Sequence, residues 1–226
     1  MSKSYLQKQI KKYDRLEIIF VSLIPIISFL LGRSLKSISI VSGVLIGLFL
    51  GALTAVLLFL GDWANDRGYS YFKGLKGEQY VEKILNKLPT NYRYFKSDKL
   101  PYADYLVVGD TGVFCLEIKN MNGKITYNAQ NKQLLRNYSP FDSNYLKQTK
   151  GNSAVASQLV KEELNENVFI NPVLVFTGRG VSLELQNKVD GVDIINSNEL
   201  LHFLQTENGY KKFDKEQQEK IYNVLV

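Results

Sequence analysis

The chain has 226 residues, of which 45% are hydrophobic and 22% charged, a composition that excludes a disordered chain and leaves room beyond one ordinary domain. Its formal net charge of +6 favours an acidic partner, such as nucleic acid or anionic lipid, without choosing between them. With one cysteine, Cys115, and one histidine, His202, an intramolecular disulfide and a Cys/His zinc site are excluded. Cys115 lies within an apolar run, so we expect a small buried thiol.

Two uncharged apolar segments lie near the N-terminus. The second, Ile38–Gly61, has 24 residues and exceeds the roughly 20 that a helix needs to cross a bilayer. The first, Ile18–Leu31, is shorter and contains Pro25, so it is either a thin span or part of a re-entrant hairpin. A signal peptide fits poorly, because no small-residue cleavage site follows. The sequence therefore predicts a two-helix transmembrane hairpin over residues 18–61, in contact with the lipid bilayer.

Basic residues predict the orientation of this hairpin. Residues 1–17 contain five Lys or Arg residues, whereas the link between the two segments contains only Arg33 and Lys36. By the positive-inside rule, both chain ends are then cytoplasmic, in a protein of the cell membrane. Neither apolar segment holds an ionisable residue, which argues against a small-molecule transporter.

Three glycines four residues apart, Gly43, Gly47 and Gly51, form a smooth strip on the second segment. Such a strip lets another helix approach closely. It serves either the chain's own hairpin or a homo-oligomer, and the sequence leaves both open.

Residues 62–74 are polar, aromatic and glycine-bearing, which is typical of a linker, and residues 75–226 follow as a cytoplasmic domain. Apolar spacing predicts a helix from Gly77 that Pro89 ends. Asn196 and Glu199 have capping-box spacing for a short helix, and Asp214 is expected to cap the last one. Strands are expected at 92–95, 105–108, 113–116, 123–128, 132–138, 167–178 and 191–196, and a further helix at 144–164. This order predicts an α/β fold with a central mixed sheet flanked by helices.

The stretch ADYLVVGDTGVFCLEIKN, residues 103–120, predicts a hairpin whose turn is centred on Asp110 and Thr111. Residue i then pairs with residue 221 − i, so that Asp104 faces Glu117 across the two strands. Side chains alternate along a strand, so Lys119 shares the face of Glu117. Apolar residues on both faces place the hairpin in the middle of a covered sheet.

Two opposed carboxylates repel each other, and a stable protein must protonate one, supply a basic neighbour or bind a divalent cation. Mg²⁺ suits such hard oxygen ligands and completes its shell with water and phosphate. Lys119 is then placed to orient or deprotonate an attacking water, or to neutralise charge in the transition state. The pattern predicts phosphodiester hydrolysis, while a simple surface pair between Glu117 and Lys119 remains the alternative.

Three ordered pieces of sequence together resemble the NERD (nuclease-related) domain, a branch of the PD-(D/E)XK nuclease superfamily. They are GLKGEQYVEKIL, then ADYLVVGDTGVFCLEIKNMNGKI, then SPF…LKQTKGN, and the resemblance covers about residues 72–180. It implies a restriction-endonuclease-like core and cleavage of DNA with Mg²⁺, or Mn²⁺ in its place; RNA stays open as a substrate. Proteins of this kind often carry membrane segments.

Carried over position by position, the resemblance implies that Asp104 and Glu117 are metal ligands and that Lys119 is the catalytic lysine. Glu78 matches the family's helical acid and is implied to touch the metal or its water. A helix-dipole role for Glu78 is the alternative. Ala103 stands where the superfamily has proline, a departure that leaves the chemistry intact.

In LKQTKGN, Gln148 matches a glutamine near the family's third motif, and with Lys150 it is the implied substrate contact. A solvent-facing or capping role for Gln148 is the alternative. Tyr92, Tyr94, Phe95 and Lys96 interleave aromatic and basic residues, as a nucleic-acid surface or a half-buried strand would.

The sequence thus predicts a membrane-tethered, metal-dependent nuclease at the inner face of a cell membrane, with a role in defence or DNA processing and a regulatory protein partner. The alternative is a non-catalytic membrane adaptor that has the nuclease fold and binds nucleic acid or a partner protein.

Overall fold

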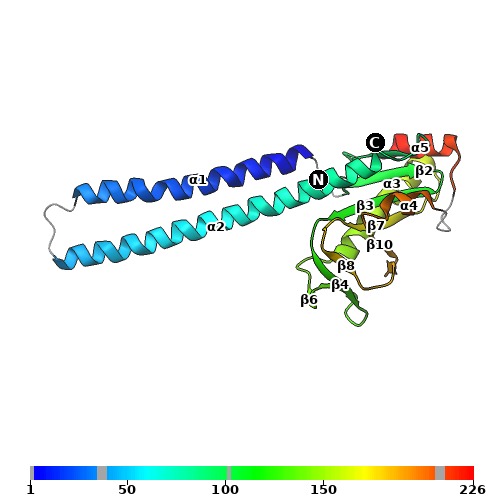
Figure 1. Cartoon of the computed structure of the whole chain (residues 1–226). Coiled ribbons are helices and arrows are strands. Elements are labelled where there is room, and N and C mark those ends of the chain that lie inside the picture. Colours follow the sequence, from blue (N-terminus) through cyan, green and yellow to red (C-terminus); the bar gives the residue numbers. More distant parts are fainter. Residues whose placement is uncertain (1–2, 35–39, 101–102, 207–211) are drawn as a thin grey trace. The chain divides into compact units, whose positions relative to one another are not determined.

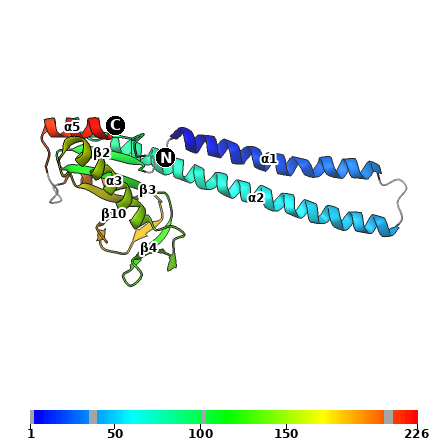
Figure 2. The same cartoon turned by 180° about the vertical axis from the view of Figure 1, so that it is seen from behind.

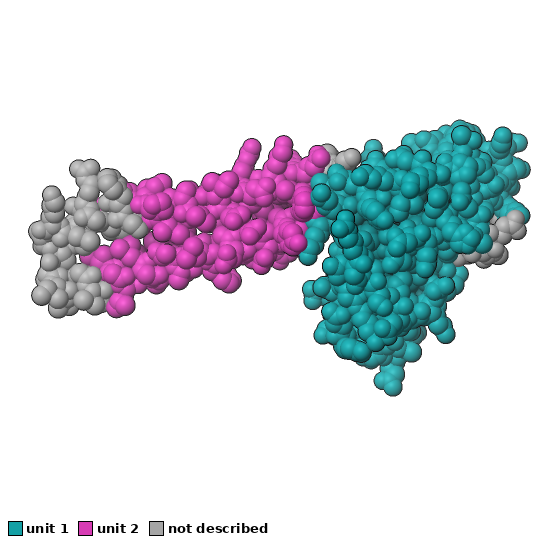
Figure 3. Space-filling model, viewed as in Figure 1, with its two compact units in different colours: residues 1–2, 73–226 teal, residues 3–72 magenta. Residues whose placement is uncertain are grey.

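The computed structural model describes residues 3–34, 40–100, 103–206 and 212–226, so half of the link predicted between the two apolar segments, including Lys36, lies outside the described residues. The chain divides into two compact units (Figure 3). One lies within residues 3–72, and the other is described over residues 73–100, 103–206 and 212–226.

The unit of residues 3–72 is a pair of helices, α1 (Lys3–Ser34) and the first part of α2 (Ile40–Leu85) (Figure 1). Tyr13 of α1 stacks on Tyr71 of α2 with 5.7 Å between ring centroids, and it meets Trp63 edge-on at 5.8 Å. Within the described part of the chain, α2 is the one helix that is long and apolar enough to cross a membrane. The structure thus supports one of the two predicted spans, and the two-span hairpin stays a prediction.

Residues 62–74, expected to be a linker, are helical and belong to α2. The boundary between the units, after Phe72, falls inside this helix, and the helix expected from Gly77 is its last part. The glycines and polar residues of this stretch suggested a loop. No proline interrupts it, however, and Trp63 and Tyr71 give it a packed face against Tyr13.

The unit of residues 73–226 contains a six-stranded mixed sheet and a separate four-stranded sheet (Figures 1 and 2). The main sheet has the order β1 (Arg93–Phe95), β2 (Tyr105–Gly109), β3 (Gly112–Lys119), β7 (Ile170–Phe176), β10 (Val192–Asn196), β9 (Lys188–Val189). Its central strands β3, β7 and β10 are parallel, and the other pairings are antiparallel. The second sheet has the order β6 (Ser139–Pro140), β5 (Gln133–Arg136), β4 (Gly123–Asn128), β8 (Val181–Leu183). The mixed α/β prediction is confirmed, whereas the second sheet was not foreseen.

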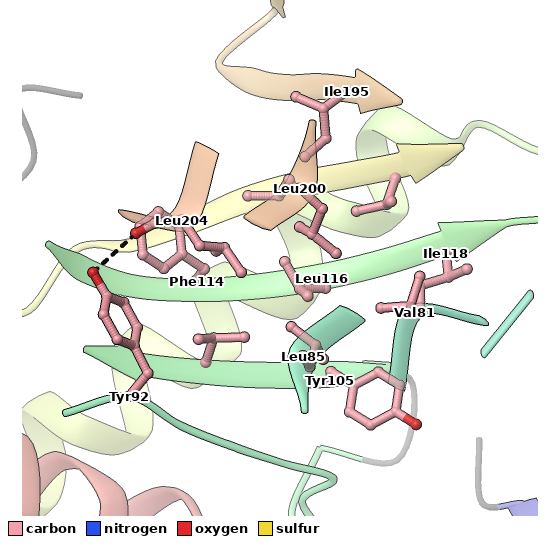
Figure 4. Close-up of a cluster of buried hydrophobic side chains, with 13 residues drawn as sticks. Val81, Leu85, Tyr92, Tyr105, Phe114, Leu116, Ile118, Ile195, Leu200 and Leu204 are labelled. Atoms are coloured by element: carbon pink, nitrogen blue, oxygen red, sulfur yellow. Dashed lines mark hydrogen bonds between the residues drawn. The ribbon is translucent and has the colours of Figure 1, made fainter. Parts of the chain in front are cut away.

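Helices cover both faces of the main sheet, as the alternation in the hairpin predicted. Tyr105, Phe114 and Leu116 pack with the end of α2 and with α4 (Leu200–Gln205), as Figure 4 shows. Leu106 and Cys115 point to the other face and pack with α3 (Tyr145–Leu164) and α5 (Lys215–Leu225). Cys115 is buried as expected, and burial raises the pKa of its thiol to about 12.

The two predicted helix caps have different outcomes. Asp214 and Gln217 form a complete capping box at the start of α5. The box expected from Asn196 and Glu199 does not form, because Asn196 Oδ1 accepts the N–H of Asn198 and Glu199 makes no side-chain cap. The Asn196 side chain thus closes a local turn instead.

Gly77 allows α2 to approach the ends of β3 and β7. A Cβ there would lie 2.8 Å from the Asn120 Cβ and 3.0 Å from the Thr177 Oγ1, whereas one at Gly74, a turn earlier, would meet nothing within 4 Å. We expect Gly77→Ala to lower the free energy of unfolding by about 1–3 kcal/mol. Gly74→Ala should leave it unchanged or raise it by about 0.5–1 kcal/mol, because alanine favours helix. Denaturant unfolding of the full-length protein in detergent, followed by near-UV circular dichroism, measures both. Equal stabilities of the two variants would contradict the close approach.

Candidate active site

The β2–β3 hairpin brings two predicted acids to one end of the main sheet. Its register runs from Tyr105–Leu116 to Gly109–Gly112, which confirms the 221 − i pairing, but the ladder stops one pair short of Asp104 and Glu117. Asp104 instead forms hydrogen bonds with the backbone of β3 on both sides of Glu117. Its N–H donates to the Leu116 carbonyl at 3.2 Å, and its Oδ2 accepts the Ile118 N–H at 2.7 Å. The strand end is therefore closed by a carboxylate rather than by a cross-strand pair.

The Glu117 carboxylate is buried, with 3% of the residue exposed, and it is surrounded by donors. Its Oε1 accepts hydrogen bonds from Lys119 Nζ at 2.5 Å and from Gln148 Nε2 at 2.9 Å. Its Oε2 accepts a longer bond from Asn152 Nδ2 at 3.4 Å. Gln148 and Asn152 are four residues apart and so share one face of α3. The Asn144 N-cap fixes where that helix starts, and thereby places both amides.

Lys119 has a second contact that limits where its ammonium group can lie. Its Nζ is 4.4 Å from the centroid of the Tyr145 ring, at the start of α3. Cation–π contact with a tyrosine and a charge-assisted bond to Glu117 together hold the lysine at the sheet edge.

Glu78, on the last part of α2, completes the group of acids. It is buried and pairs with Lys96, which follows β1. Lys96 also lies over the Tyr105 ring, 4.8 Å from its centroid. Two lysines from different parts of the chain therefore neutralise two buried carboxylates at the same sheet edge.

The acids influence each other electrostatically. Burial and, after it, the negative charge of Asp104 raise the pKa of Glu117 to about 7, against the opposing effect of Lys119. Burial and Asp104 also raise the pKa of Glu78, against the effect of Lys96. Desolvation disfavours a carboxylate, and a like charge nearby adds to the cost. Perturbed acids of this kind are common at functional sites.

The structure thus brings together four of the residues singled out in the sequence, Asp104, Glu117, Lys119 and Gln148, and places Glu78 near enough to Asp104 for their charges to interact. Lys150 does not join them, because its ammonium group pairs instead with the carboxylate of Asp190. Gln148 neither caps α3 nor faces only solvent, since it bonds to Glu117.

Sequence reasoning missed two residues of this group, Asn152 and Lys96. Asn152 could have been found, because it lies one helical turn after Gln148. Lys96 was noted only as part of an aromatic and basic strand, and its pairing with Glu78 depends on the tertiary fold.

The carboxylates fit a hard divalent cation in their donor chemistry, since Mg²⁺ prefers oxygen ligands and would relieve the repulsion between Asp104 and Glu117. Among the described residues, however, no three His, Cys, Asp or Glu side chains converge as a ready metal site. Lys119 and Lys96 supply the positive charge instead.

Residues 73–177 match the family model of the nuclease-related domain, NERD. The match begins at Lys73, at the boundary between the two compact units. It includes every residue of the acid and lysine group, by which we mean Glu78, Lys96, Asp104, Glu117, Lys119, Gln148 and Asn152. This part of the chain is therefore a nuclease-related domain, the NERD domain. Comparisons with curated proteins and with solved structures found no match.

Glu117 should make the stability of the domain depend on pH. Its pKa is raised to about 7 in the folded state, so the folded chain binds more protons than the unfolded chain between about pH 4.5 and pH 7. Its contribution to stability is present below that window and is lost as the pH rises through it. We expect Glu117→Gln, which cannot ionise, to gain on the order of 2 kcal/mol over the wild type at pH 8, and little at pH 4.5.

Unfolding of the full-length protein with chelator, from pH 4.5 to pH 8, measures this difference. Glu163→Gln, on the exposed last turn of α3, is the matched control. A constant difference between wild type and Glu117→Gln over the whole range would show that ionised Glu117 does not oppose folding.

Proposed function

We propose that the chain is a membrane-tethered, Mg²⁺-dependent nuclease of the PD-(D/E)XK type that hydrolyses phosphodiester bonds, with DNA as its substrate. The observation that carries the proposal is the buried Glu117 carboxylate, bonded to Lys119 at the end of a buried hairpin. Burying such a pair costs desolvation energy that an apolar pair would not. Within a nuclease-related domain, catalysis accounts for that cost.

In this proposal Asp104, Glu117 and Glu78 hold the ion, and Mg²⁺, or Mn²⁺ in its place, supplies a Lewis acid for a phosphoryl oxygen when bound. Lys119 orients the attacking water or neutralises charge that develops on the phosphoryl group. Gln148 holds the Glu117 carboxylate in its orientation and is close enough to the sheet edge to contact the substrate.

The membrane tether is supported by the apolar surface of the unit of residues 3–72. α2 carries exposed Leu48, Phe49 and Phe59, and α1 carries exposed Ile18 and Leu30. Large exposed apolar surfaces of this kind indicate contact with lipid or with another protein. We propose that both helices span the cell membrane with both chain ends in the cytoplasm, where tethering concentrates the nuclease at the site of DNA entry for defence or processing.

The glycine strip is proposed to serve a homo-oligomer. A Cβ at Gly47 or Gly51 would meet nothing within 4 Å, so α1 does not fill the strip at these positions. The side-chain surroundings of Gly43 lie outside the described residues. A regulatory protein partner is part of the same proposal, because a nuclease inside a cell requires restraint.

One observation favours the second candidate, a non-catalytic adaptor that binds nucleic acid or a partner protein. The lysines already neutralise Glu117 and Glu78, and the described residues contain no ready cluster of metal ligands. A fold that has lost metal binding would have the same pairs.

Loss of either member of the Glu117–Lys119 pair should greatly lower the rate of DNA cleavage. We expect full-length protein in detergent to cut plasmid and linear DNA with Mg²⁺ or Mn²⁺ and not with chelator. Glu117→Ala and Lys119→Ala should each lower the rate by about 10²–10³-fold, the usual effect of removing a group that stabilises the transition state. Lys161→Ala, near the opposite end of α3, removes the same charge as Lys119→Ala and should cut normally.

Gel assays of DNA and RNA, with calorimetric titration of Mg²⁺, decide between the two candidates. If the wild type cuts neither substrate and binds no metal, the nuclease proposal fails and the adaptor replaces it.

The topology can be tested because the native Cys115 is buried and should not react. In intact cells, a membrane-impermeant maleimide should label Ser34→Cys, at the end of α1, and should label Lys8→Cys only after lysis. Labelling of Lys8→Cys before lysis would overturn the proposed orientation.

A further inference from the structure

A polar cleft of about 520 Å³ lies at the carboxyl ends of the three parallel strands of the main sheet. β3, β7 and β10 end level with one another, with Lys119 beside Phe176 and Phe176 beside Asn196. The segments that follow these strands line the cleft together with α2, through Lys76, Asn120, Asn122, Thr177, Arg179 and Asn198. Ligands of sheets with parallel strands commonly bind at this edge.

The lining residues have the chemistry of an anion site. Two are cationic, Lys76 and Arg179, and the described lining contains no Asp or Glu. Arg179 is exposed and makes no hydrogen bond or ion pair with the part of the chain that the structure describes. An unpaired guanidinium among amide and hydroxyl donors matches a phosphate group, which accepts several hydrogen bonds at once.

Thr177 gives an independent indication. Its Oγ1 is buried and has no hydrogen-bond partner among the described residues, although it lies at the wall of the cleft. A buried polar atom without a partner is costly and calls for an explanation, such as a ligand. The Thr177 N–H bonds to the Lys119 carbonyl at 3.1 Å, which fixes this wall to the end of β3.

The cleft continues from the acid and lysine group. Asn120 follows Lys119, and Gly77 of the cleft precedes Glu78. Lys119 points to the α3 side of the sheet, and the cleft opens on the α2 side. A nucleic-acid strand that passes over the carboxyl ends of the parallel strands would therefore meet both.

We infer that this cleft binds a phosphate of the nucleic-acid backbone next to the one that is cleaved. The inference rests on the proposed nuclease function and adds a second contact that holds the strand across the ends of β3, β7 and β10. Such a contact with the backbone positions any sequence equally.

The test measures binding of a fluorescent 20-base-pair DNA duplex to full-length protein in detergent and EDTA, over a range of salt concentrations, by fluorescence anisotropy. Arg179→Ala should weaken binding about 5- to 20-fold for every sequence and lower the salt slope by about 1. Thr177→Val should weaken it about threefold without loss of thermal stability, since it removes an unsatisfied hydroxyl.

Arg93→Ala is the matched control. Arg93 starts β1 opposite Val108, at the far end of the sheet from Glu117, and its exposed pair with Glu219 contributes little to stability. Equal affinity and salt slope for Arg179→Ala and Arg93→Ala would overturn the inference. A second result would also overturn the inference. If millimolar inorganic phosphate abolishes the difference in duplex affinity between wild type and Arg179→Ala, the cleft is a site for free phosphate.

Cleavage of the same duplex with Mg²⁺ separates this inference from the proposed function. If wild type and Arg179→Ala cut at equal rates and bind the duplex equally, the proposed nuclease function is retained and the phosphate contact in the cleft is rejected. If neither cuts but Arg179→Ala binds more weakly, the backbone contact stands without the nuclease.

Discussion

The arrangement of this site depends on the burial of Glu117 on a strand that is covered on both faces. Helices cover both faces of the sheet at β3, so a carboxylate buried on this strand must find donors within the protein. Lys119 comes from the same strand, while Gln148 and Asn152 come from α3 on the covering layer. The start of α3, the strand register and the placement of Lys119 are therefore linked through one carboxylate.

The second buried acid shows the same principle with different elements. Glu78 comes from α2 and its partner Lys96 from the segment after β1, so their pair ties a helix to the edge of the sheet. Gly77 permits the close approach that this requires, next to Asn120 and Thr177. A side chain at Gly77 would separate the helix from the strand ends, and Glu78 would move with it. Packing at one glycine thus controls the electrostatics of the neighbouring residue.

The sequence predicted local features well and tertiary ones less well. The hairpin register followed from a two-residue turn and from alternation, because a shift by one residue would have moved Leu106 and Cys115 to the opposite face of the sheet. The Asp214 cap was also visible in the sequence. The pairing of Lys96 with Glu78 joins residues 18 positions apart, and nothing in their local sequence indicates it. The helical residues 62–74 pack through Trp63 and Tyr71 against Tyr13, which lies about 50 residues earlier in the sequence.

The covering of both faces of the sheet also explains why the polar and charged residues lie at the ends of the strands and not in their middles. Residues 105–108 and 113–116 are apolar and fill two cores, and the polar side chains gather where the ladder stops, at Asp104, Lys119 and Asn120. There the backbone is still fixed by neighbouring strands, but one side of the edge is open. Rigid support on one side and access on the other are what a site for a charged ligand needs. Because Lys119 and Lys96 pair with Glu117 and Glu78, the positive charge beside these buried acids comes from the fold itself.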